Sequence, residues 1–207
     1  MSWISSTLME CFFPAQATGD ALVAVLTNKG GNSSPAGRLP MTWPMFASQI
    51  PPMVNYSMEN RTYRYMSTAP LYPFGYGLSY SQFEYLEMIL NIIVAPQQDL
   101  TVALSVQNVG DISADEVIQC YISWGNQSLP VPNRQLVYFN RILVLSGDIV
   151  KHIFTVSWEN WSYWDNEKWT VQTGIMTIMC GGQQPFQKKS APSNILTKTF
   201  QVVGTSP

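Results

Sequence analysis

Residues 100–107 read Leu-Thr-Val-Ala-Leu-Ser-Val-Gln, and apolar side chains alternate strictly with polar or small ones. Successive side chains of a β-strand point to opposite faces, so this alternation predicts a strand with one buried face. The next four residues, Asn-Val-Gly-Asp at 108–111, are typical of a turn. This stretch therefore predicts that the C-terminal part of the chain consists of half-buried strands joined by tight turns.

Similar short segments recur on both sides of this strand. They occupy residues 83–94, 118–124, 135–145, 154–158, 176–180 and 196–203. About seven short strands separated by turn signals fit an antiparallel Greek-key sandwich of the immunoglobulin-like type. We therefore expect a mainly β protein whose sandwich spans residues 81–207.

The N-terminal third has a different pattern. Residues 8–13 form an apolar run that predicts a buried strand, and Thr18 is a candidate cap for a helix that ends at Gly30-Gly31. Residues 39–43 predict a second short strand. Such a strand–helix–strand unit is too small to bury its own apolar faces, so it requires more sheet than this segment contains.

Residues 46–80, here called the strap, are rich in Pro, Tyr and Met. Proline interrupts regular structure, and a long aromatic segment is unfavourable if it is left in water. We expect the strap to lie extended over a folded surface. The predicted organisation is therefore an α/β fragment at 1–45, an extended linker at 46–80 and a β-sandwich domain at 81–207.

Composition excludes several classes of partner. The chain has 207 residues, of which 46% are apolar but only 12% charged, and its net charge is −2. Nucleic acids and anionic membrane surfaces require clustered positive charge, so neither is an expected partner. The longest apolar stretch, residues 89–95, is too short to span a membrane. Aromatic residues at 13% nevertheless predict a packed protein.

The first ten residues lack the basic and long apolar regions of a secretory signal. Asn-X-Ser/Thr sequons nevertheless favour a secretory or lysosomal route for the intact protein. The five candidate glycosylation sites are Asn32, Asn55, Asn60, Asn126 and Asn160. The expected location is therefore extracellular or lysosomal.

The three cysteines have no spacing suited to zinc. Under one interpretation, Cys11, Cys120 and Cys180 are small apolar side chains. Under the other, Cys120 and Cys180 form one disulfide and Cys11 stays unpaired. The strand parities allow this bridge but do not require it.

The residues point to no catalytic centre, metal site or cofactor. His152 has no nucleophile motif beside it, and it is interpreted as a surface or hydrogen-bonded histidine. Asp115-Glu116 is interpreted as a solvated strand edge. Asp20 and Glu59 lie where a cleft could form, but no spacing pairs two carboxylates as acid and nucleophile.

Aromatic side chains are concentrated between residues 158 and 169. Trp158, Trp161, Tyr163, Trp164 and Trp169 lie within this segment, and Tyr56, Tyr63 and Tyr65 lie on the strap. These rings either form a platform for sugar rings or fill the sandwich core and its contact with the N-terminal unit. The sequence leaves both alternatives open.

Several stretches resemble the C-terminal part of family 3 glycoside hydrolases. Residues 34–44, Ser-Pro-Ala-Gly-Arg-Leu-Pro-Met-Thr-Trp-Pro, resemble the end of the α/β sandwich domain of that family. Residues 56–65 and 70–80 (Pro-Leu-Tyr-Pro-Phe-Gly-Tyr-Gly-Leu-Ser-Tyr) resemble the linker that follows it. The order and spacing of these motifs strengthen the resemblance, which runs from about residue 8 to residue 204.

Further motifs resemble the fibronectin type III-like domain that closes these enzymes. They are Asn-Val-Gly-Asp at 108–111, Asp-Glu-Val-Ile-Gln-Cys-Tyr at 115–121 and Gln-Leu-Val-Tyr-Phe at 135–139. Gly-Gly-Gln-Gln-Pro at 181–185, with Ser-Asn-Ile-Leu at 193–196, is more similar to the β-xylosidase branch than to the β-glucosidase branch. The resemblance therefore implies a β-xylosidase-like protein with a fibronectin type III-like sandwich.

The resemblance also implies an activity and identifies what this sequence lacks. A retaining exo-glycosidase that removes terminal β-linked sugars, here xylose, uses two carboxyl groups roughly 5 Å apart. In the family, the nucleophile lies in an N-terminal barrel and the acid/base lies earlier in the α/β domain. Neither motif occurs here, so no catalytic or substrate-binding residue is assigned, and we expect the chain alone to be inactive. The expected partners are the barrel and the remainder of the α/β domain.

Two functional interpretations therefore follow. In the first, the chain is the C-terminal part of a secreted glycosidase that acts in carbohydrate (xylan-type) breakdown. In the second, it is a non-catalytic sandwich module that binds glycans or a protein through its Trp and Tyr clusters.

Overall fold

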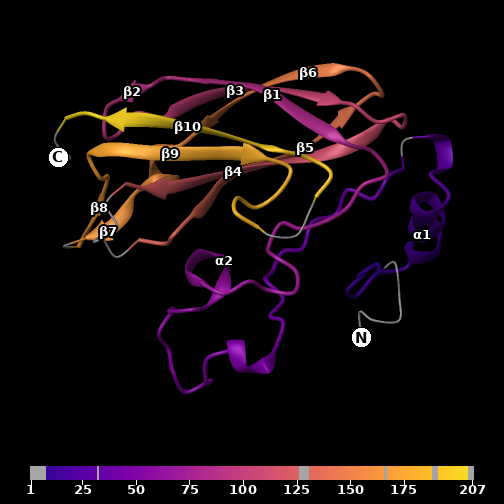
Figure 1. Cartoon of the computed structure of the whole chain (residues 1–207), viewed down its shortest axis with the longest axis horizontal. Coiled ribbons are helices and arrows are strands. Elements are labelled where there is room, and N and C mark those ends of the chain that lie inside the picture. The colour runs from indigo at the N-terminus through magenta and orange to yellow at the C-terminus, as the bar shows by residue number, and fades with distance from the viewer. Residues whose placement is uncertain (1–7, 32, 126–130, 166, 188–190, 205–207) are drawn as a thin grey trace.

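The structure is a computed structural model, and it describes residues 8–31, 33–125, 131–165, 167–187 and 191–204. Its strands gather in one body, and the segments before residue 81 lie along and below that body (Figure 1). The prediction of a mainly β fold, with a sandwich that follows an extended linker, is confirmed. Of the predicted α/β fragment, the described residues contain the helix.

One layer of the sandwich is a three-stranded antiparallel sheet. Its strands are β1 (Phe83–Leu90), β3 (Leu100–Asn108) and β6 (Ile149–Val156), in the order β1-β3-β6. The alternating stretch at 100–107 lies in the central strand. Its apolar members, from Leu100 to Val106, are buried, whereas the side chains between them are less buried.

The second layer has five strands in the order β2-β10-β9-β4-β5. Their bounds are β2 (Ile93–Val94), β4 (Ala114–Trp124), β5 (Gln135–Val144), β9 (Gly174–Gly181) and β10 (Ile195–Val202). The chain crosses from one sheet to the other between β1 and β2, and β2 pairs in parallel with β10. The predicted strand at 83–94 is thus divided between both layers.

The core lies between the two sheets. The side chains of Leu104, Ile122 and Ile178 have no solvent exposure, and they belong to one continuous apolar cluster. The Trp161 ring is equally buried and meets Phe200 edge to face, with ring centroids 5.6 Å apart. Sequence periodicity therefore identified the strands that enclose the core.

Two small elements follow β6. The 3-10 helix η3 covers Trp158–Trp161. The strand predicted at 154–158 therefore ends earlier, at Val156, and Trp158 belongs to the helical turn. A hairpin of β7 (Tyr163–Asp165) and β8 (Lys168–Thr170) comes next. This hairpin forms a separate two-stranded sheet beside the sandwich.

The N-terminal segment differs from the sequence prediction at two points. Residues 8–13 form no strand and are exposed, because no strand in the described part of the chain bonds with their backbone. The helix α1 covers Thr18–Leu26, but the cap position is Ala17, and the Thr18 side chain bonds to the Ala15 carbonyl. The predicted strand at 8–13 and the Thr18 cap are therefore wrong.

The short helical elements of this region are η1 (Lys29–Gly31), η2 (Ala47–Gln49) and α2 (Thr62–Tyr65). The predicted strand at 39–43 is also wrong. Within this segment, Trp43 alone takes part in β-pairing, through an isolated bridge to Tyr72. Backbone bonds nevertheless join the two segments, including Leu39 N–H to the Tyr76 carbonyl at 2.9 Å. The strap thus doubles back on the chain that precedes it.

Candidate functional site

The candidate carboxylates lie in three different environments. Asp20 and Glu59 are exposed, on α1 and on the strap respectively. Asp115 accepts a hydrogen bond from Arg141 Nε at 2.7 Å near the surface. Glu116, in contrast, has no solvent exposure, so the interpretation of Asp115-Glu116 as a solvated edge is wrong for Glu116.

Glu116 lies in a buried ion pair with a residue far away in the sequence. Arg38 Nη2 donates to Glu116 Oε2 at 2.9 Å, and the Arg38 side chain is only 6% exposed. The Tyr85 hydroxyl donates to Glu116 Oε1 at 3.2 Å. Burial raises the pKa of Glu116 to about 7, although the positive charge of Arg38 and the Tyr85 hydrogen bond act in the opposite direction.

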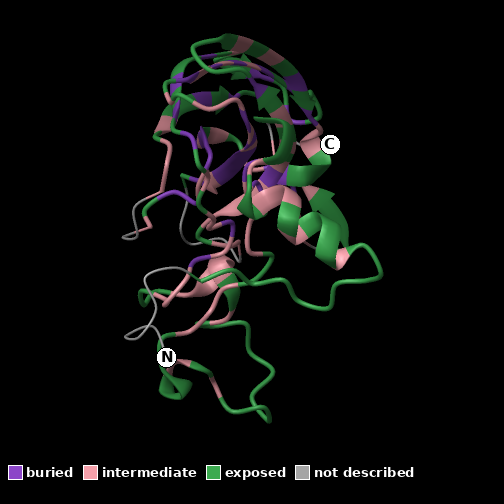
Figure 2. Cartoon of the chain, turned by 90° about the vertical axis from the view of Figure 1, so that its right-hand side faces the viewer, coloured by how far each residue is buried: buried purple, intermediate pink, exposed green. Residues whose placement is uncertain are grey.

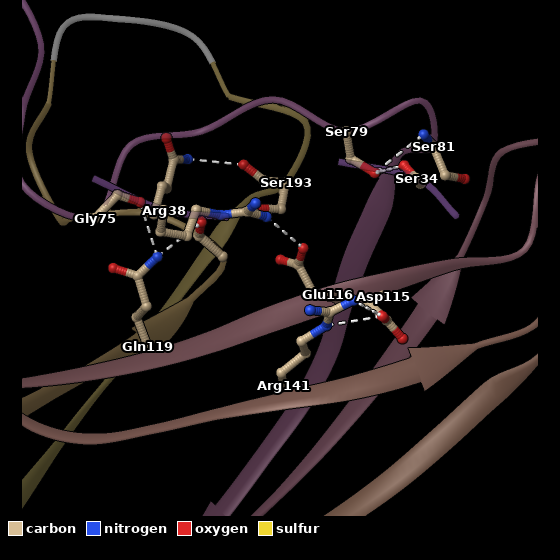
Figure 3. A network of polar contacts seen from close by, with 12 residues as sticks. Ser34, Arg38, Gly75, Ser79, Ser81, Asp115, Glu116, Gln119, Arg141 and Ser193 are labelled. Carbon is tan, nitrogen blue, oxygen red and sulfur yellow. Dashed lines mark hydrogen bonds and ion pairs between the residues drawn. The ribbon is translucent and has the colours of Figure 1, made fainter. Parts of the chain in front are cut away.

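Gln119 extends this polar network along the same strand (Figure 3). Its Nε2 donates to the Gly75 carbonyl at 2.9 Å and to the Gly182 carbonyl at 3.1 Å, and its Oε1 accepts from the Tyr121 hydroxyl at 2.7 Å. A single strand, β4, therefore binds the N-terminal segment through Glu116 and the strap through Gln119.

A second polar contact closes the same junction. The hydroxyls of Ser34 and Ser79 lie 2.9 Å apart (Figure 3). Tyr80 N–H donates to Ser34 Oγ at 3.0 Å. Ser34 is one of the few buried side chains before the sandwich. The segment at 34–38 is thus held at both ends by polar bonds to the strap and to β4.

Chemically, this network suits a structural joint better than a reaction centre. Glu116 is fully shielded from solvent, and its neighbours Arg38, Tyr85 and Gln119 supply no second carboxyl group. Retaining hydrolysis would need two carboxyls flanking an accessible sugar. Among the residues that the structure describes, none gathers with two others into a His, Cys, Asp or Glu cluster able to hold a metal ion.

The two C-terminal cysteines are covalently joined in the structure. Cys120 on β4 lies directly opposite Cys180 on β9, and their Cα atoms are 4.1 Å apart. Both side chains are fully buried between the sheets. Cys11 is a free, exposed cysteine.

Three of the candidate glycosylation sites lie in the described part of the chain. Asn55, Asn60 and Asn160 are all exposed. Asn32 and Asn126 fall outside the described residues. An exposed position is what an attached glycan requires, so the three described sites are sterically suitable.

His152 is a hydrogen-bonded histidine on β6. Its Nε2 lies 2.6 Å from the Tyr138 hydroxyl, and its ring stacks on Phe154 with centroids 5.6 Å apart. Burial lowers the pKa of the imidazole. The hydrogen bond to Tyr138 agrees with the interpretation of His152 as a surface or hydrogen-bonded histidine.

The aromatic cluster is divided between the two alternatives that the sequence left open. Trp161 is buried in the core, and Trp158 packs against it. Trp164 and Trp169 instead face each other across the β7–β8 hairpin, edge to face at 5.3 Å, and each is 57% exposed. Within the described segment 158–169, the hairpin pair is therefore the accessible part of the cluster, and Tyr56 on the strap is also exposed.

Sequence reasoning missed the contributions of Arg38, Tyr85 and Gln119. Arg38 and Gln119 lie within motifs that carry the family resemblance, but those motifs assign no partner to either side chain. Each of the three residues bonds to a partner between 31 and 78 residues away, and Gln119 also has a short link to Tyr121. The one available signal was the position of Gln119 within an apolar strand. Such a residue requires a buried partner.

No helix within the described part of the chain has the length and hydropathy needed to cross a membrane.

Two family models match this sequence. The glycosyl hydrolase family 3 C-terminal domain matches residues 1–80, and the fibronectin type III-like domain matches residues 116–184. The predicted fibronectin type III-like fold is therefore confirmed. The first match extends across both the α/β fragment and the strap.

Known proteins are similar over most of the chain. Xylan 1,4-beta-xylosidase of Xylanibacter ruminicola is 34% identical over 167 residues, which cover 80% of this chain and 19% of that protein. Thermostable beta-glucosidase B of Acetivibrio thermocellus is 30% identical over 199 residues, which cover 87% of this chain and 26% of that protein.

A solved structure extends the similarity to the fold. Beta-D-glucoside glucohydrolase of Trichoderma reesei matches with a TM-score of 0.75 at 27% identity, over 91% of this chain and 29% of that one. The chain spans about a quarter of the length of these relatives. With its two domain matches, it corresponds to the C-terminal region of a family 3 glycoside hydrolase, including the fibronectin type III-like domain.

Proposed function

We propose that this chain is the non-catalytic C-terminal part of a retaining exo-acting β-glycosidase with β-D-xylosidase specificity. The observation that carries the proposal is the buried Arg38–Glu116 ion pair. It joins residues 1–80, which match the family 3 C-terminal domain, to the sandwich. The similarity to a xylan xylosidase and the motifs at 181–185 and 193–196 support xylose over glucose. The intact enzyme would act in xylan-type carbohydrate breakdown.

The arrangement of carboxyl groups supports inactivity of the chain by itself. Hydrolysis with retention needs a nucleophile and an acid/base roughly 5 Å apart. In the described residues, Glu116 is buried beside Arg38, and Asp115 is bound to Arg141. Both carboxylates are therefore engaged in ion pairs, and neither faces a second carboxyl across an open cleft.

The partners of the chain would be the barrel and the rest of the α/β domain of the parent enzyme. Helix α1 has no buried residue, although Leu22, Val23 and Leu26 lie along it. Figure 2 shows exposed colouring along most of the N-terminal part, whereas buried residues gather in the sandwich. Apolar surface of this kind is typical of a face that another domain covers.

An extracellular or lysosomal location belongs to the same proposal. A buried disulfide between Cys120 and Cys180 is typical of proteins that fold in an oxidising compartment. The exposed sequon residues Asn55, Asn60 and Asn160 also suit that route. Mass spectrometry of the protein from its native source, before and after enzymatic removal of N-glycans, tests it. Unmodified asparagines and free thiols would count against this location.

The central experiment compares two proteins on nitrophenyl β-xyloside and nitrophenyl β-glucoside. The 207-residue chain should hydrolyse neither, whereas a protein that adds a barrel and complete α/β domain before residue 1 should hydrolyse the xyloside faster. Turnover that follows the purified chain through chromatography would overturn the proposed inactivity. A preference for the glucoside would overturn the xylosidase specificity alone.

The second candidate function is a binding module that works without catalysis. It is favoured by one observation, the exposed Trp164–Trp169 pair on the hairpin. If the hairpin binds glycans, xylo-oligosaccharides should quench tryptophan fluorescence in the wild-type chain and not in Trp164→Ala. The coding sequence upstream of Met1 separates the two functions as well, because a barrel-encoding region there supports the enzyme.

A further inference from the structure

A hollow of about 160 Å³ lies where the strap meets the loop after β9. It shares no residue with the Glu116 network or the disulfide. Strap residues including Tyr63, Pro70 and Pro73 form one side, and Gln184 and Phe186 of the loop form the other. Arg134, just before β5, completes the lining. Two segments more than 100 residues apart in sequence thus enclose one space.

Among the described residues that line the hollow, Arg134 carries the only charge, and none of them has a carboxyl group. Its Nη1 donates to the Pro185 carbonyl at 2.9 Å, and its guanidinium carbon lies 5.7 Å from the centre of the Phe186 ring. The described structure pairs Arg38 and Arg141 with carboxylates, but it records no such pair for Arg134. Burial lowers the pKa of Arg134, although a guanidinium remains cationic at neutral pH.

A partly buried cation without a counter-ion favours the entry of an anion. The planar guanidinium has five N–H donors, and the bond to Pro185 uses one nitrogen only. The remaining donors match the two oxygens of a carboxylate, a geometry that a lysine could not reproduce. The charge and shape of Arg134 therefore select a carboxylate ligand.

Polar groups around Arg134 would suit hydroxyl groups on the same ligand. Gln184 is 7% exposed, and its Oε1 accepts no hydrogen bond in the described structure. Thr42 Oγ1 is likewise shielded and unbonded there. The Tyr63 hydroxyl accepts the Leu136 N–H at 3.0 Å, which leaves its hydrogen for a second partner. A buried carbonyl oxygen without a donor is unfavourable, so a ligand hydroxyl that donates to it would remove that cost.

The walls of the hollow are fixed before any ligand enters. The Tyr63 ring stacks on Phe74 at 4.3 Å and meets Tyr121 edge to face at 5.9 Å. The backbone of α2 is tied to the sandwich, because Asn133 N–H donates to the Arg64 carbonyl at 2.9 Å. Such preorganisation lowers the entropic cost of binding.

From these groups we infer that the hollow binds one hydroxylated sugar carboxylate, a uronic acid. Arg134 would bind the carboxylate, Gln184 and Thr42 would meet the ring hydroxyls, and the exposed Phe186 ring would cover the apolar face of the sugar. The volume is below the roughly 300–1,000 Å³ of most ligand pockets, so the proposed ligand is limited to a single sugar unit.

The first experiment titrates the ¹⁵N-labelled 207-residue chain with D-glucuronate and with D-glucose at equal ionic strength. These sugars differ only in a carboxylate against a hydroxymethyl group, so their difference isolates the Arg134 contribution. Glucuronate should bind at least tenfold more tightly, and shifts should concentrate at the side-chain amide of Gln184 and the backbone of Phe186. Equal binding of the two sugars would overturn the inference.

Two further ligands identify the chemistry and its source. Sodium acetate carries the carboxylate without the hydroxyls and should bind at least tenfold more weakly than glucuronate. If acetate or inorganic phosphate binds as well as glucuronate, the hollow is a simple anion site, and the sugar assignment is wrong. A xylo-oligosaccharide with a glucuronic acid branch should match free glucuronate if the natural source is a polysaccharide side group.

Matched variants test the residues. Arg134→Gln should weaken glucuronate binding at least tenfold and leave glucose binding within twofold, whereas Arg141→Gln removes an equal charge from an exposed ion pair and should change neither. Because Arg134→Gln also removes the bond to Pro185, its folding is checked by thermal unfolding. Phe186→Ala alters an exposed ring, so it keeps the test valid if Arg134→Gln does not fold, and it should weaken glucuronate binding severalfold.

The inference and the proposed function fail separately. Glucuronate binding needs only the chain itself, whereas xyloside hydrolysis needs the additional domains. An active parent enzyme with no glucuronate binding would overturn the inference alone. Glucuronate binding by a chain whose parent lacks glycosidase activity would overturn the proposed function alone.

Discussion

The sandwich and the residues before it bury apolar surface to very different extents. Within the described residues, the buried apolar side chains lie at or beyond Phe83, apart from Ala36 and Pro73. The segment at 8–80 instead exposes large side chains such as Phe13, Met53 and Tyr56. Its described contacts with the sandwich include the polar bond from Arg38 to Glu116, the bond from Gln119 to the Gly75 carbonyl, and the ring contact of Tyr63 with Tyr121.

This contrast separates two ways of keeping a segment folded. The sandwich has its own core, and burial of apolar area is the dominant favourable contribution to folding. The N-terminal part depends on a few directional contacts, whose net contributions are small unless the groups are buried and charged. Its conformation should therefore depend on its neighbours, whereas that of the sandwich should not.

Dividing the chain tests the contrast most directly. A protein of residues 81–207 should unfold in one cooperative transition, whereas a peptide of residues 1–75 should show none, since it lacks a core. Circular dichroism during heating measures both. A cooperative melt from the 1–75 peptide would remove the basis of the comparison.

Breaking the buried ion pair should have the next largest effect. Arg38→Met leaves Glu116 buried without its cation, and the full chain should lose roughly 3–5 kcal/mol of unfolding free energy at pH 8. Denaturant titration measures this loss.

The matched control replaces both partners. Arg38→Met with Glu116→Leu leaves no uncompensated charge, so most of the lost stability should return. Arg141→Met, at the exposed pair with Asp115, should cost less than about 1 kcal/mol. If Arg38→Met and Arg141→Met cost the same, burial does not distinguish the two ion pairs.

The pH dependence of the unfolding free energy should reflect the titration of the Glu116 carboxyl group. Its pKa is raised from 4.5 in the unfolded chain to about 7 in the folded one, so the folded state binds the proton more tightly. Protonation therefore contributes stability in full below pH 4.5, and this contribution disappears as pH rises to about 7. The loss should reach up to about 3 kcal/mol.

Glu116→Gln removes this titration. Its stability should be flatter between pH 4.5 and 7 than that of the wild type, when both are measured by denaturant titration. A wild-type curve that rises with pH across this interval would contradict the raised pKa.

The smallest effect concerns the hairpin. Trp164→Ala should cost about 1 kcal/mol or less, because the ring is mostly exposed and loses mainly its contact with Trp169. Trp161→Ala, three residues earlier in the core, should cost roughly 3–5 kcal/mol. Similar melting temperatures for the two variants would show that the hairpin is part of the core.

Sequence periodicity predicted the sandwich well because strand alternation is a local signal. The alternating stretch at 100–107 and the segments at 118–124 and 176–180 all became strands with their apolar sides buried. The apolar run at 8–13 was predicted as a strand by similar reasoning and is not one. A strand needs a neighbour for its backbone bonds, and the sequence of one segment contains no information about whether that neighbour is present.

The candidate sites were harder to predict for the same physical reason. Glu116 follows a turn and looks like a surface residue, but Arg38 reaches it from 78 positions earlier. The hollow around Arg134 likewise depends on the approach of the strap to a distant loop. Local patterns specify strands, whereas buried polar partners are specified by the assembled fold.

Gly75 and Gly182, which lie against the Glu116 network, limit where this chain can be joined to a related one in a chimera. A side chain at Gly75 would collide with Gln119, and one at Gly182 would collide with Glu116 and Ser193. Arg38, Gly75, Gln119 and Gly182 should therefore be inherited together. A chimera joined at the apparent boundary near residue 80 would separate half of this set from the rest. A chimera joined before Ser34 would keep all four residues in the same parent sequence, so their contacts would be preserved.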